Sequence, residues 1–138
     1  MKPYNRPLTI WGFLWSLPVT VLGLPLALLS FPSLGLRGGV LLCVGNRGFA
    51  HLFLAKRGYA AITLGHILIA IRPPPNHLWQ HEREHTRQAQ RLGIFFLLAY
   101  LFFLARHGYR QNPFEVAARQ VQDQFRADNP AIADQLIG

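Results

Sequence analysis

The sequence predicts an α+β fold, with an apolar helical segment at the N-terminus, a small and mostly antiparallel sheet, and three helices after it. Three observations predict this order. An uncharged apolar stretch covers residues 8–31, short apolar runs separated by turn residues fill 39–71, and helix-starting and helix-ending residues divide 76–126 into three segments. A chain of 138 residues is a single domain by length, with room for one modest core.

The stretch over residues 8–31 is long enough to cross a hydrocarbon core of about 30 Å. Trp11 and Trp15 lie near one end, where interfacial anchors are common. No small-residue cleavage site follows the stretch, which favours a retained signal anchor over a removed signal peptide. Pro18 and Pro25 interrupt a straight helix, so a kinked span or a re-entrant hairpin is the alternative.

Charge is distributed unevenly along the chain. Charged residues make up 14% of the sequence, against about 25% in ordinary soluble domains, and the net charge is +8. The first 81 residues contain no Asp or Glu, which suits an anionic lipid surface. The basic residues are scattered among Leu, Phe and Ile, which argues against a nucleic-acid partner. We therefore expect a membrane-associated segment over residues 1–34 and a separate small domain over 35–138.

Residues 39–71 are predicted to form strands. The runs VLLCV, FAHLFLA, YAAITL and ILIAI are separated by glycine-containing turns, a pattern typical of a small meander. A second transmembrane helix is the alternative, but it would place Arg47, Lys56 and Arg57 in lipid, which is strongly unfavourable. Cys43 is the only cysteine, so it excludes an internal disulfide, and its apolar surroundings predict a small buried hydrophobe.

Three helices are expected after a run of three prolines. The first begins with Asn76 as N-cap and runs to about Leu92, where Gly93 ends it. The second covers residues 94–106, and its apolar run of about 11 residues is too short to span a bilayer, so it is a core or interfacial helix. The third runs over residues 112–126, with apolar residues at a spacing of three and four that form a core face.

The first of these helices carries the string His81-Glu82-Arg83-Glu84-His85, which matches the pattern HExxH. Residues four apart lie on the same helix face, so His81 and His85 can share one metal ion. Glu82 projects about 100° round the helix from His81, where it can take a proton from a metal-bound water. The alternative is a solvated, charged helix face that binds no metal.

A catalytic zinc site needs a third protein ligand. Glu115 lies one turn into the third helix, 30 residues beyond His85, and would complete a His₂Glu set. A second role competes for the same side chain. With Asn112 as N-cap and Pro113 at the first helical position, Glu115 occupies the third position, where a glutamate closes a capping box.

These residues resemble the gluzincin group of zinc metallopeptidases, in which a Glu on a downstream helix follows HExxH. The fuller pattern HEREHTRQ…LG…Tyr…NPFE..A, over about residues 61–118, resembles small bacterial membrane-linked proteins of a minimal gluzincin type. The resemblance implies that His81, His85 and Glu115 bind Zn²⁺ and that Glu82 is the catalytic base. It also implies a membrane-associated peptidase or amide hydrolase of the bacterial inner membrane, with its zincin-like domain over residues 35–138.

The chain is shorter than typical peptidases of this group, which leaves little room for a substrate subdomain. The group uses a downstream His or Tyr to stabilise the oxyanion, and Tyr109 is the candidate here, with His107 as the alternative. Two other functions remain open: a non-catalytic membrane protein with a structural zinc, and a basic lipid-surface binding protein without metal. The presence of Glu82 favours the hydrolase, because a structural site needs no carboxylate beside His81.

Three further polar residues have mostly structural interpretations. Gln88 lies one turn beyond His85 and is a candidate hydrogen-bonding partner of that ligand, although packing or exposure is an equal alternative. His66 lies in a turn, where a structural role is favoured over a place at the site. His51 alternates within the predicted strand FAHLFLA and is not expected to be a ligand.

Overall fold

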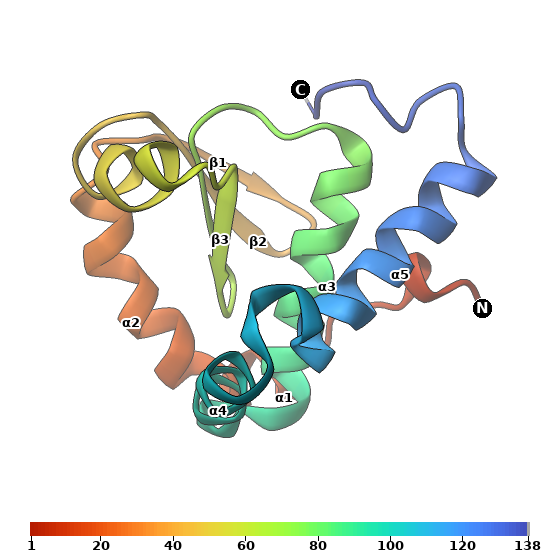
Figure 1. Ribbon diagram of the computed structural model, residues 1–138, viewed down its shortest axis with the longest axis horizontal. Helices are drawn as coiled ribbons and strands as arrows, with labels where there is room; N and C mark the ends of the chain where they lie inside the picture. Colours follow the sequence, from red (N-terminus) through yellow and green to blue (C-terminus); the bar gives the residue numbers. More distant parts are fainter. Residues whose placement is uncertain (138) are drawn as a thin grey trace.

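The computed structural model describes residues 1–137 and has an α+β fold, with a four-stranded sheet packed between helices (Figure 1). The strands lie in the order β1-β2-β4-β3. They cover β1 Ser33–Arg37, β2 Val40–Val44, β3 Ala61–Leu64 and β4 Ile67–Ala70. β1 pairs with β2 and β3 with β4 in antiparallel fashion, whereas β2 and β4 are parallel. The sheet is therefore mixed. Two of its three pairings are antiparallel, as expected for a mostly antiparallel sheet, but the parallel pairing of β2 with β4 does not occur in the predicted meander.

The core lies on both faces of β4, whose four residues are all buried. Ile67 and Ile69 pack with Cys43 on the side of helix α2 (Leu17–Leu28), while Leu68 packs with Trp79 of helix α3 (Asn76–Leu92) on the other side. Successive side chains of a strand point to opposite faces, so a continuous apolar run is what a strand covered on both faces requires. The burial of Cys43 as a small hydrophobe is confirmed, since it has no exposed surface.

The run FAHLFLA does not form the predicted strand. It forms the helical turns η2 (Ala50–Leu54) and η3 (Ala55–Arg57). Phe49 and Phe53 stack with a centroid distance of 4.9 Å, as residues four apart do on a helix. Because nearly every position in the run is apolar, its sequence does not distinguish the two-residue period of a strand from the 3.6-residue period of a helix. This helical connection carries the chain across the sheet, so that β4 enters beside β2 in parallel.

The apolar stretch over residues 8–31 does not form one continuous helix. This segment forms two helices, α1 (Ile10–Trp15) and α2, separated at Ser16, so the broken alternative is the one the structure adopts. Pro18 lies in the first turn of α2, where a missing N–H is tolerated, and it disfavours a helix that continues from α1. Within residues 1–137, no single helix is long and apolar enough to cross a membrane; α3 and α4 together have the length and composition, but they are bent by 118°.

The N-terminal segment packs against the rest of the chain. α1 contacts α3, and α2 contacts β3 and β4. Before them, the turn η1 (Pro3–Asn5) places Tyr4 against Phe125 of helix α5, and the Tyr4 hydroxyl donates a hydrogen bond of 2.7 Å to Asp128. These contacts connect the start of the chain to its last helix.

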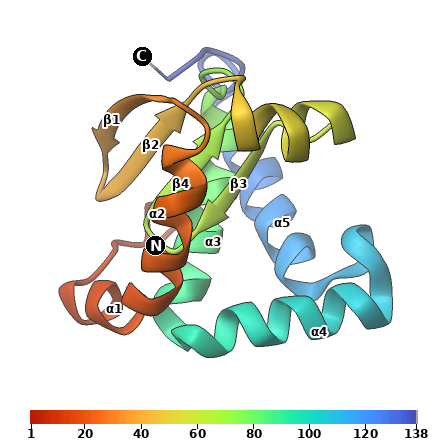
Figure 2. The same ribbon diagram turned by 90° about the vertical axis from the view of Figure 1, so that its left-hand side faces the viewer.

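The three C-terminal helices are confirmed as α3 (Asn76–Leu92), α4 (Ile94–Gln111) and α5 (Pro113–Asp128), and Figure 2 shows α4 crossing beneath the other two. The N-cap of α3 is Pro75 and not Asn76, whose side chain donates to the carbonyl of Ile132. Gly93 makes the bend into α4 with a φ of 60°, a backbone conformation that glycine adopts readily.

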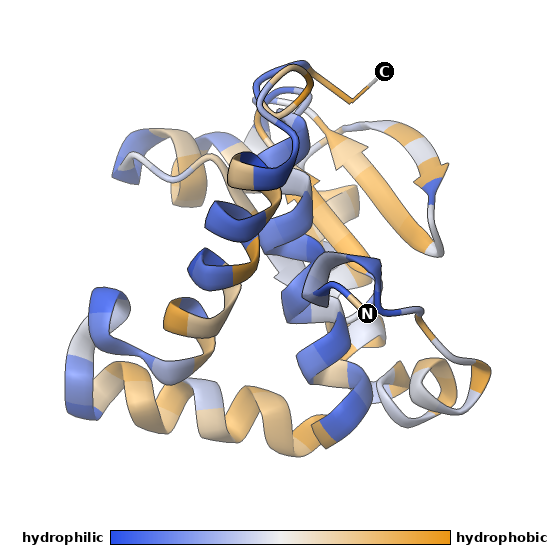
Figure 3. Ribbon diagram, turned by 90° about the vertical axis from the view of Figure 1, so that its right-hand side faces the viewer, coloured by the Kyte–Doolittle hydropathy of each residue, from blue (hydrophilic) through white to orange (hydrophobic). Residues whose placement is uncertain are grey.

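Helix α4 packs on one side only. Phe96 is buried, whereas Phe95, Leu98 and Phe102 are each more than half exposed. Figure 3 shows α4 as a largely hydrophobic ribbon along one edge of the molecule, with hydrophilic residues at its C-terminal end. α4 is therefore not a helix buried on all sides, and one apolar side of it is exposed.

Candidate metal centre

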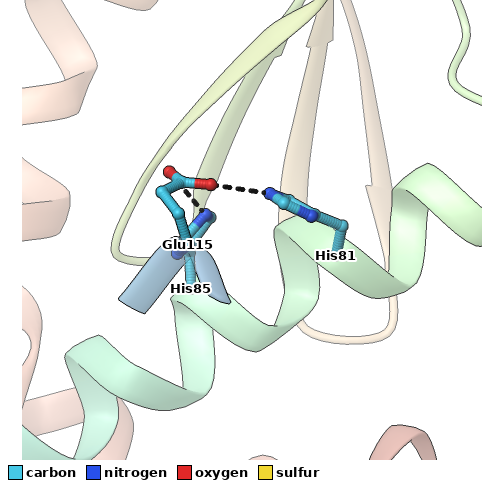
Figure 4. Close-up of side chains that lie close together, drawn as sticks. All are labelled: His81, His85 and Glu115. Atoms are coloured by element: carbon cyan, nitrogen blue, oxygen red, sulfur yellow. Dashed lines mark hydrogen bonds and ion pairs between the residues drawn. The ribbon is translucent and has the colours of Figure 1, made fainter. Parts of the chain in front are cut away.

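The structure brings His81, His85 and Glu115 together, as the sequence predicted (Figure 4). Nε2 of His81 lies 3.1 Å from one Glu115 oxygen, and Nε2 of His85 lies 3.2 Å from the other. One ligand atom from each residue falls within 4.8 Å of the other two, and all three side chains are buried. Two imidazole nitrogens and a carboxylate oxygen in this arrangement could hold a metal ion.

Glu115 does not close the capping box that its position allowed. Asn112 is the N-cap of α5, as predicted, and its side chain accepts a hydrogen bond of 3.1 Å from the main-chain N–H of Phe114. The carboxylate of Glu115 turns instead toward the two histidines and accepts a hydrogen bond of 2.6 Å from the hydroxyl of Tyr100. The cap and the candidate ligand are therefore separate residues of one turn.

The tautomer of His85 follows from its hydrogen bonds. Gln88 donates its amide NH₂ to the main-chain carbonyl of Phe114 at 3.0 Å, which accepts only, so the amide oxygen of Gln88 must face His85. That oxygen lies 2.9 Å from Nδ1 of His85. Nδ1 therefore carries the hydrogen, and in the neutral ring the lone pair of Nε2 points to the cluster, as metal binding requires.

His81 has an equivalent partner on α5. Its Nδ1 lies 3.0 Å from the amide oxygen of Gln122, and the amide nitrogen of Gln122 lies 2.9 Å from Nδ1 of His77. The sequence analysis missed Gln122. Its position seven residues after Glu115, two turns along the same face of α5, is the signal that could have found it.

Burial and charge act in opposite directions on the ligands. Burial alone would lower the pKa of His85, but its hydrogen bond to Glu115 and the negative charges of Glu82 and Glu115 raise that pKa to about 9. Burial alone would raise the pKa of Glu115, but hydrogen bonds from His81 and His85 hold it well below the usual range. The cluster thus holds a buried carboxylate that is kept negative, which suits a cation between it and the imidazoles.

Glu82, the predicted base, is buried beside this cluster. It accepts a hydrogen bond of 2.6 Å from the hydroxyl of Thr63 on β3, and it lines a cavity together with His85 and Glu115. Strand β3 packs on α3, so the sheet fixes the position of this carboxylate.

Two tyrosines of α4 border the site. Tyr109 lines the cavity that Glu82 and Glu115 line, and burial, together with the negative charges of Glu115 and Glu82, raises the pKa of its hydroxyl. His107, the alternative candidate, stacks on Phe103 and lines no cavity at the site. Tyr100 was missed by the sequence analysis. A lone hydroxyl within an apolar helix is the signal that could have identified it, because a buried Tyr O–H requires a partner.

The other histidines have structural contacts. Nδ1 of His66 lies 2.7 Å from the carbonyl of Gly39, and its Nε2 lies 2.9 Å from the amide nitrogen of Gln90. Nδ1 of His51 lies 3.1 Å from the side-chain oxygen of Asn46, in a helical turn and not in a strand. Neither belongs to the metal-binding group, in agreement with the sequence analysis.

Comparison of the chain with models of protein families, with curated proteins and with solved structures gave no match.

Proposed function

We propose that this protein is a zinc-dependent peptidase or amide hydrolase that acts at a membrane. One observation carries the proposal: a buried His₂Glu group lies beside a second buried carboxylate, and a cavity reaches both. The arrangement agrees with the resemblance of the sequence to gluzincins.

The donor set fits zinc. Zinc binds imidazole nitrogen and carboxylate oxygen, and catalytic sites use three protein ligands with one position left for water or substrate, whereas structural sites are closed by four. His81, His85 and Glu115 would supply three ligands. When bound there, zinc would supply a water of lowered pKa and would polarise the substrate carbonyl.

The side chains around the ligands have distinct tasks in this proposal. Glu82, oriented by Thr63, accepts a proton from the attacking water and passes it to the leaving nitrogen. Tyr100 holds the carboxylate of Glu115, while Gln88 and Gln122 hold the two imidazoles. Tyr109, which lines the same cavity, donates a hydrogen bond to the carbonyl oxygen of the substrate as negative charge develops there; its place in the cavity wall supports this role.

The membrane part of the proposal is supported by exposed apolar surface. Helices α1, α2 and α4 all carry large apolar side chains that are more than half exposed, among them Ile10, Trp11, Leu28, Leu98 and Phe102. A soluble monomer rarely exposes so many on neighbouring elements. Together with the net charge of +8, they favour a surface that meets anionic lipid.

Metal content and hydrolysis, measured on the same detergent-purified protein, test the proposal. The wild type is expected to contain about one zinc per chain and to cleave members of an amide and peptide panel. Glu82→Gln is expected to keep the zinc and lose about 10²–10⁴ in rate. Glu84→Gln is the matched control, because this carboxylate of the same helix pairs with Arg87 and Arg91 and lines neither cavity at the site.

The possible results separate the alternatives. Protein without zinc would overturn the metal site. Zinc in both variants and no hydrolysis by the wild type would instead identify a non-catalytic protein with a structural zinc. Full activity in zinc-loaded Glu82→Gln would remove Glu82 from the mechanism.

A further inference from the structure

Two cavities of different character meet at Glu82. Both are lined by Tyr59, Ala61, Glu82 and Tyr109. One extends past His85 and the other past His81, so the reacting group of a substrate beside Glu82 would have one cavity on each side.

The cavity on the His85 side is apolar. It has a volume of about 340 Å³, within the roughly 300–1,000 Å³ usual for ligand sites, and apart from the candidate metal centre its walls are mainly Phe, Leu and Ile side chains. Its one basic residue among residues 1–137 is Arg57, whose guanidinium lies over the ring of Phe53. Two of its residues, Phe53 and Leu101, are each more than 40% exposed and reach the apolar surface of the molecule. An apolar chain can therefore enter from the surface proposed to meet lipid.

The cavity on the His81 side is polar and basic. It has a volume of about 750 Å³ and is lined by Arg110, Arg119 and Gln122, with Glu82 as its only acidic residue among residues 1–137. The guanidinium of Arg119 donates a hydrogen bond to the main-chain carbonyl of Arg110, so this side chain of α5 reaches the backbone of α4. Within the described part of the chain, neither arginine pairs with a carboxylate. Two guanidinium groups without an acidic partner suit an anionic group such as a carboxylate.

From this pairing of cavities we infer the substrate class: an amphiphilic amide with an extended apolar chain on one side of the scissile bond and a carboxylate on the other. The inference rests on the proposed function for the cleavage step, but not for binding. In cleavage, one water adds across the C–N bond: the carbonyl carbon gains the oxygen and becomes a carboxylic acid, and the nitrogen gains a proton and leaves as the amine. Both an N-acyl amino acid and a short apolar peptide with a free C-terminus combine an apolar chain, an amide bond and a carboxylate in this way.

Binding to the full-length, zinc-loaded Glu82→Gln protein in lipid nanodiscs tests the inference, with calorimetry as the readout and metal-free protein in parallel. The probes are N-decanoylglycine, its neutral amide N-decanoylglycinamide, and N-acetylglycine, which lacks the long chain. N-decylsuccinamate presents the same two ends with the amide reversed. The peptide Leu-Leu-Phe-Gly, with a free or an amidated C-terminus, distinguishes a peptide source from an acyl source.

We expect N-decanoylglycine or its reversed analogue to bind at least tenfold more tightly than both the neutral amide and N-acetylglycine. Arg110→Gln and Arg119→Gln should remove the preference for the carboxylate, while Arg106→Gln, an exposed arginine of α4 that lines neither cavity, should keep it. Leu101→Trp should weaken binding of the long chain at least tenfold. Leu98→Trp, on the same helix, similarly exposed and outside both cavities, should not.

Equal binding of the charged and neutral amides, or unchanged binding in both arginine variants, would overturn the inference. The fate of the proposed function is read separately in the wild type. Tight binding of these probes without cleavage would support the inferred ligand class and rule out the hydrolase. Cleavage of peptides that have neither an apolar chain nor a carboxylate would support the hydrolase and rule out the inferred ligand class.

Discussion

Gln88 connects two helices at the candidate metal centre, because it accepts a hydrogen bond from Nδ1 of His85 at 2.9 Å and donates one to the carbonyl of Phe114 at 3.0 Å. Phe114 immediately precedes Glu115. One glutamine side chain therefore ties a candidate ligand on α3 to the backbone beside a candidate ligand on α5. The orientation of the His85 ring and the position of the carboxylate are set by the same residue.

We predict that Gln88→Leu lowers zinc affinity by about 10–100-fold, the usual effect of losing an outer partner of a metal-bound histidine. The leucine fills a similar volume but neither accepts from His85 nor donates to Phe114. Competition with a chromophoric chelator measures the affinity. Gln90→Leu is the control, since Gln90 lies on the same helix but bonds to Thr9 and His66. Equal zinc affinity in wild type and Gln88→Leu would contradict this role.

The ligands were predictable because their spacing is local or nearly so. His81 and His85 lie one helical turn apart, and this relation holds on any α-helix. Glu115 required a tertiary assumption, that α5 returns to α3, and a short helix followed by Asn112-Pro113 made that return plausible. The positions of Gln122 and Tyr100 at the site depend on how three helices pack around the cluster. The sequence of a single segment does not predict that packing.

The sheet was less predictable. The runs that form β2, β3 and β4 were identified, but β1 was not: it has only two apolar residues, Leu34 and Leu36, and both are exposed. FAHLFLA is almost wholly apolar and so reads as a strand or a helix, and it packs Ala50 and Leu54 into the core, four residues apart, as a helical turn. Once that segment is helical, β4 can lie parallel to β2. The prediction of a strand for FAHLFLA therefore led to the wrong partner for β2.

We predict that Glu115→Gln weakens zinc binding by more than the roughly 10–100-fold typical of a changed outer partner, because a neutral amide is a poor zinc ligand. In the metal-free protein the start of α5 should keep its cap in this variant, since Asn112 accepts from the main-chain N–H of Phe114 independently of Glu115. Zinc titration and thermal unfolding are measured on the same preparation. Asp123→Asn, an exposed carboxylate on the same helix, serves as the control. Wild-type zinc affinity in Glu115→Gln would exclude this carboxylate from the site.

The metal-free and zinc-loaded proteins should respond to pH in opposite directions. In the metal-free protein the pKa of His85 is raised from 6.5 to about 9, so its stabilising contribution is complete below about pH 6.5 and is lost as the pH rises through 9. Zinc binding requires neutral imidazoles, so zinc affinity should increase over the same range. Thermal unfolding at pH 6.5, 7.5 and 8.5, with zinc or with a chelator, measures both slopes. Parallel slopes would show that zinc does not bind at His85.

Loss of the Glu115 charge should destabilise the metal-free protein at the acidic end. The pKa of Glu115 is lowered below its usual value of 4.5, so its contribution is present above that value and is lost as the pH falls further. In Glu115→Gln, the stability of the metal-free protein should therefore depend less on pH in the acid range than in the wild type.

We predict that the exposed apolar side of α4 contributes to membrane binding together with α1 and α2. Leu98→Glu combined with Phe102→Glu should lower partition into anionic vesicles at least tenfold, because burial of one such side chain is worth about 1.5–3 kcal/mol. Gln120→Glu combined with Gln124→Glu adds the same charge on exposed positions of α5 and should have a smaller effect. Vesicle flotation gives the partition. Full-length protein that stays in solution without detergent or lipid would contradict membrane association itself.

Tyr109 and Tyr100 both lie on α4, but we expect different roles for them: Tyr109 acts on the substrate and Tyr100 on Glu115. The Tyr109 side chain lines both cavities, and its raised pKa keeps the hydroxyl protonated and able to donate. If it stabilises the oxyanion, Tyr109→Phe should lower kcat by about 10²–10³, with little change in KM or zinc content, because the hydrogen bond strengthens only in the transition state.

Two further variants complete this experiment: His107→Ala is the control, and Tyr100→Phe tests the other tyrosine. His107→Ala should leave kcat unchanged, since His107 stacks on Phe103 and lies outside both cavities. Tyr100→Phe should instead alter zinc affinity, because the Tyr100 hydroxyl donates to Glu115 and not to a substrate. A Tyr109→Phe variant that loses zinc, or that changes only KM, would show that Tyr109 has a structural role at the site. Tyr109 would then not be the hydrogen-bond donor to the oxyanion.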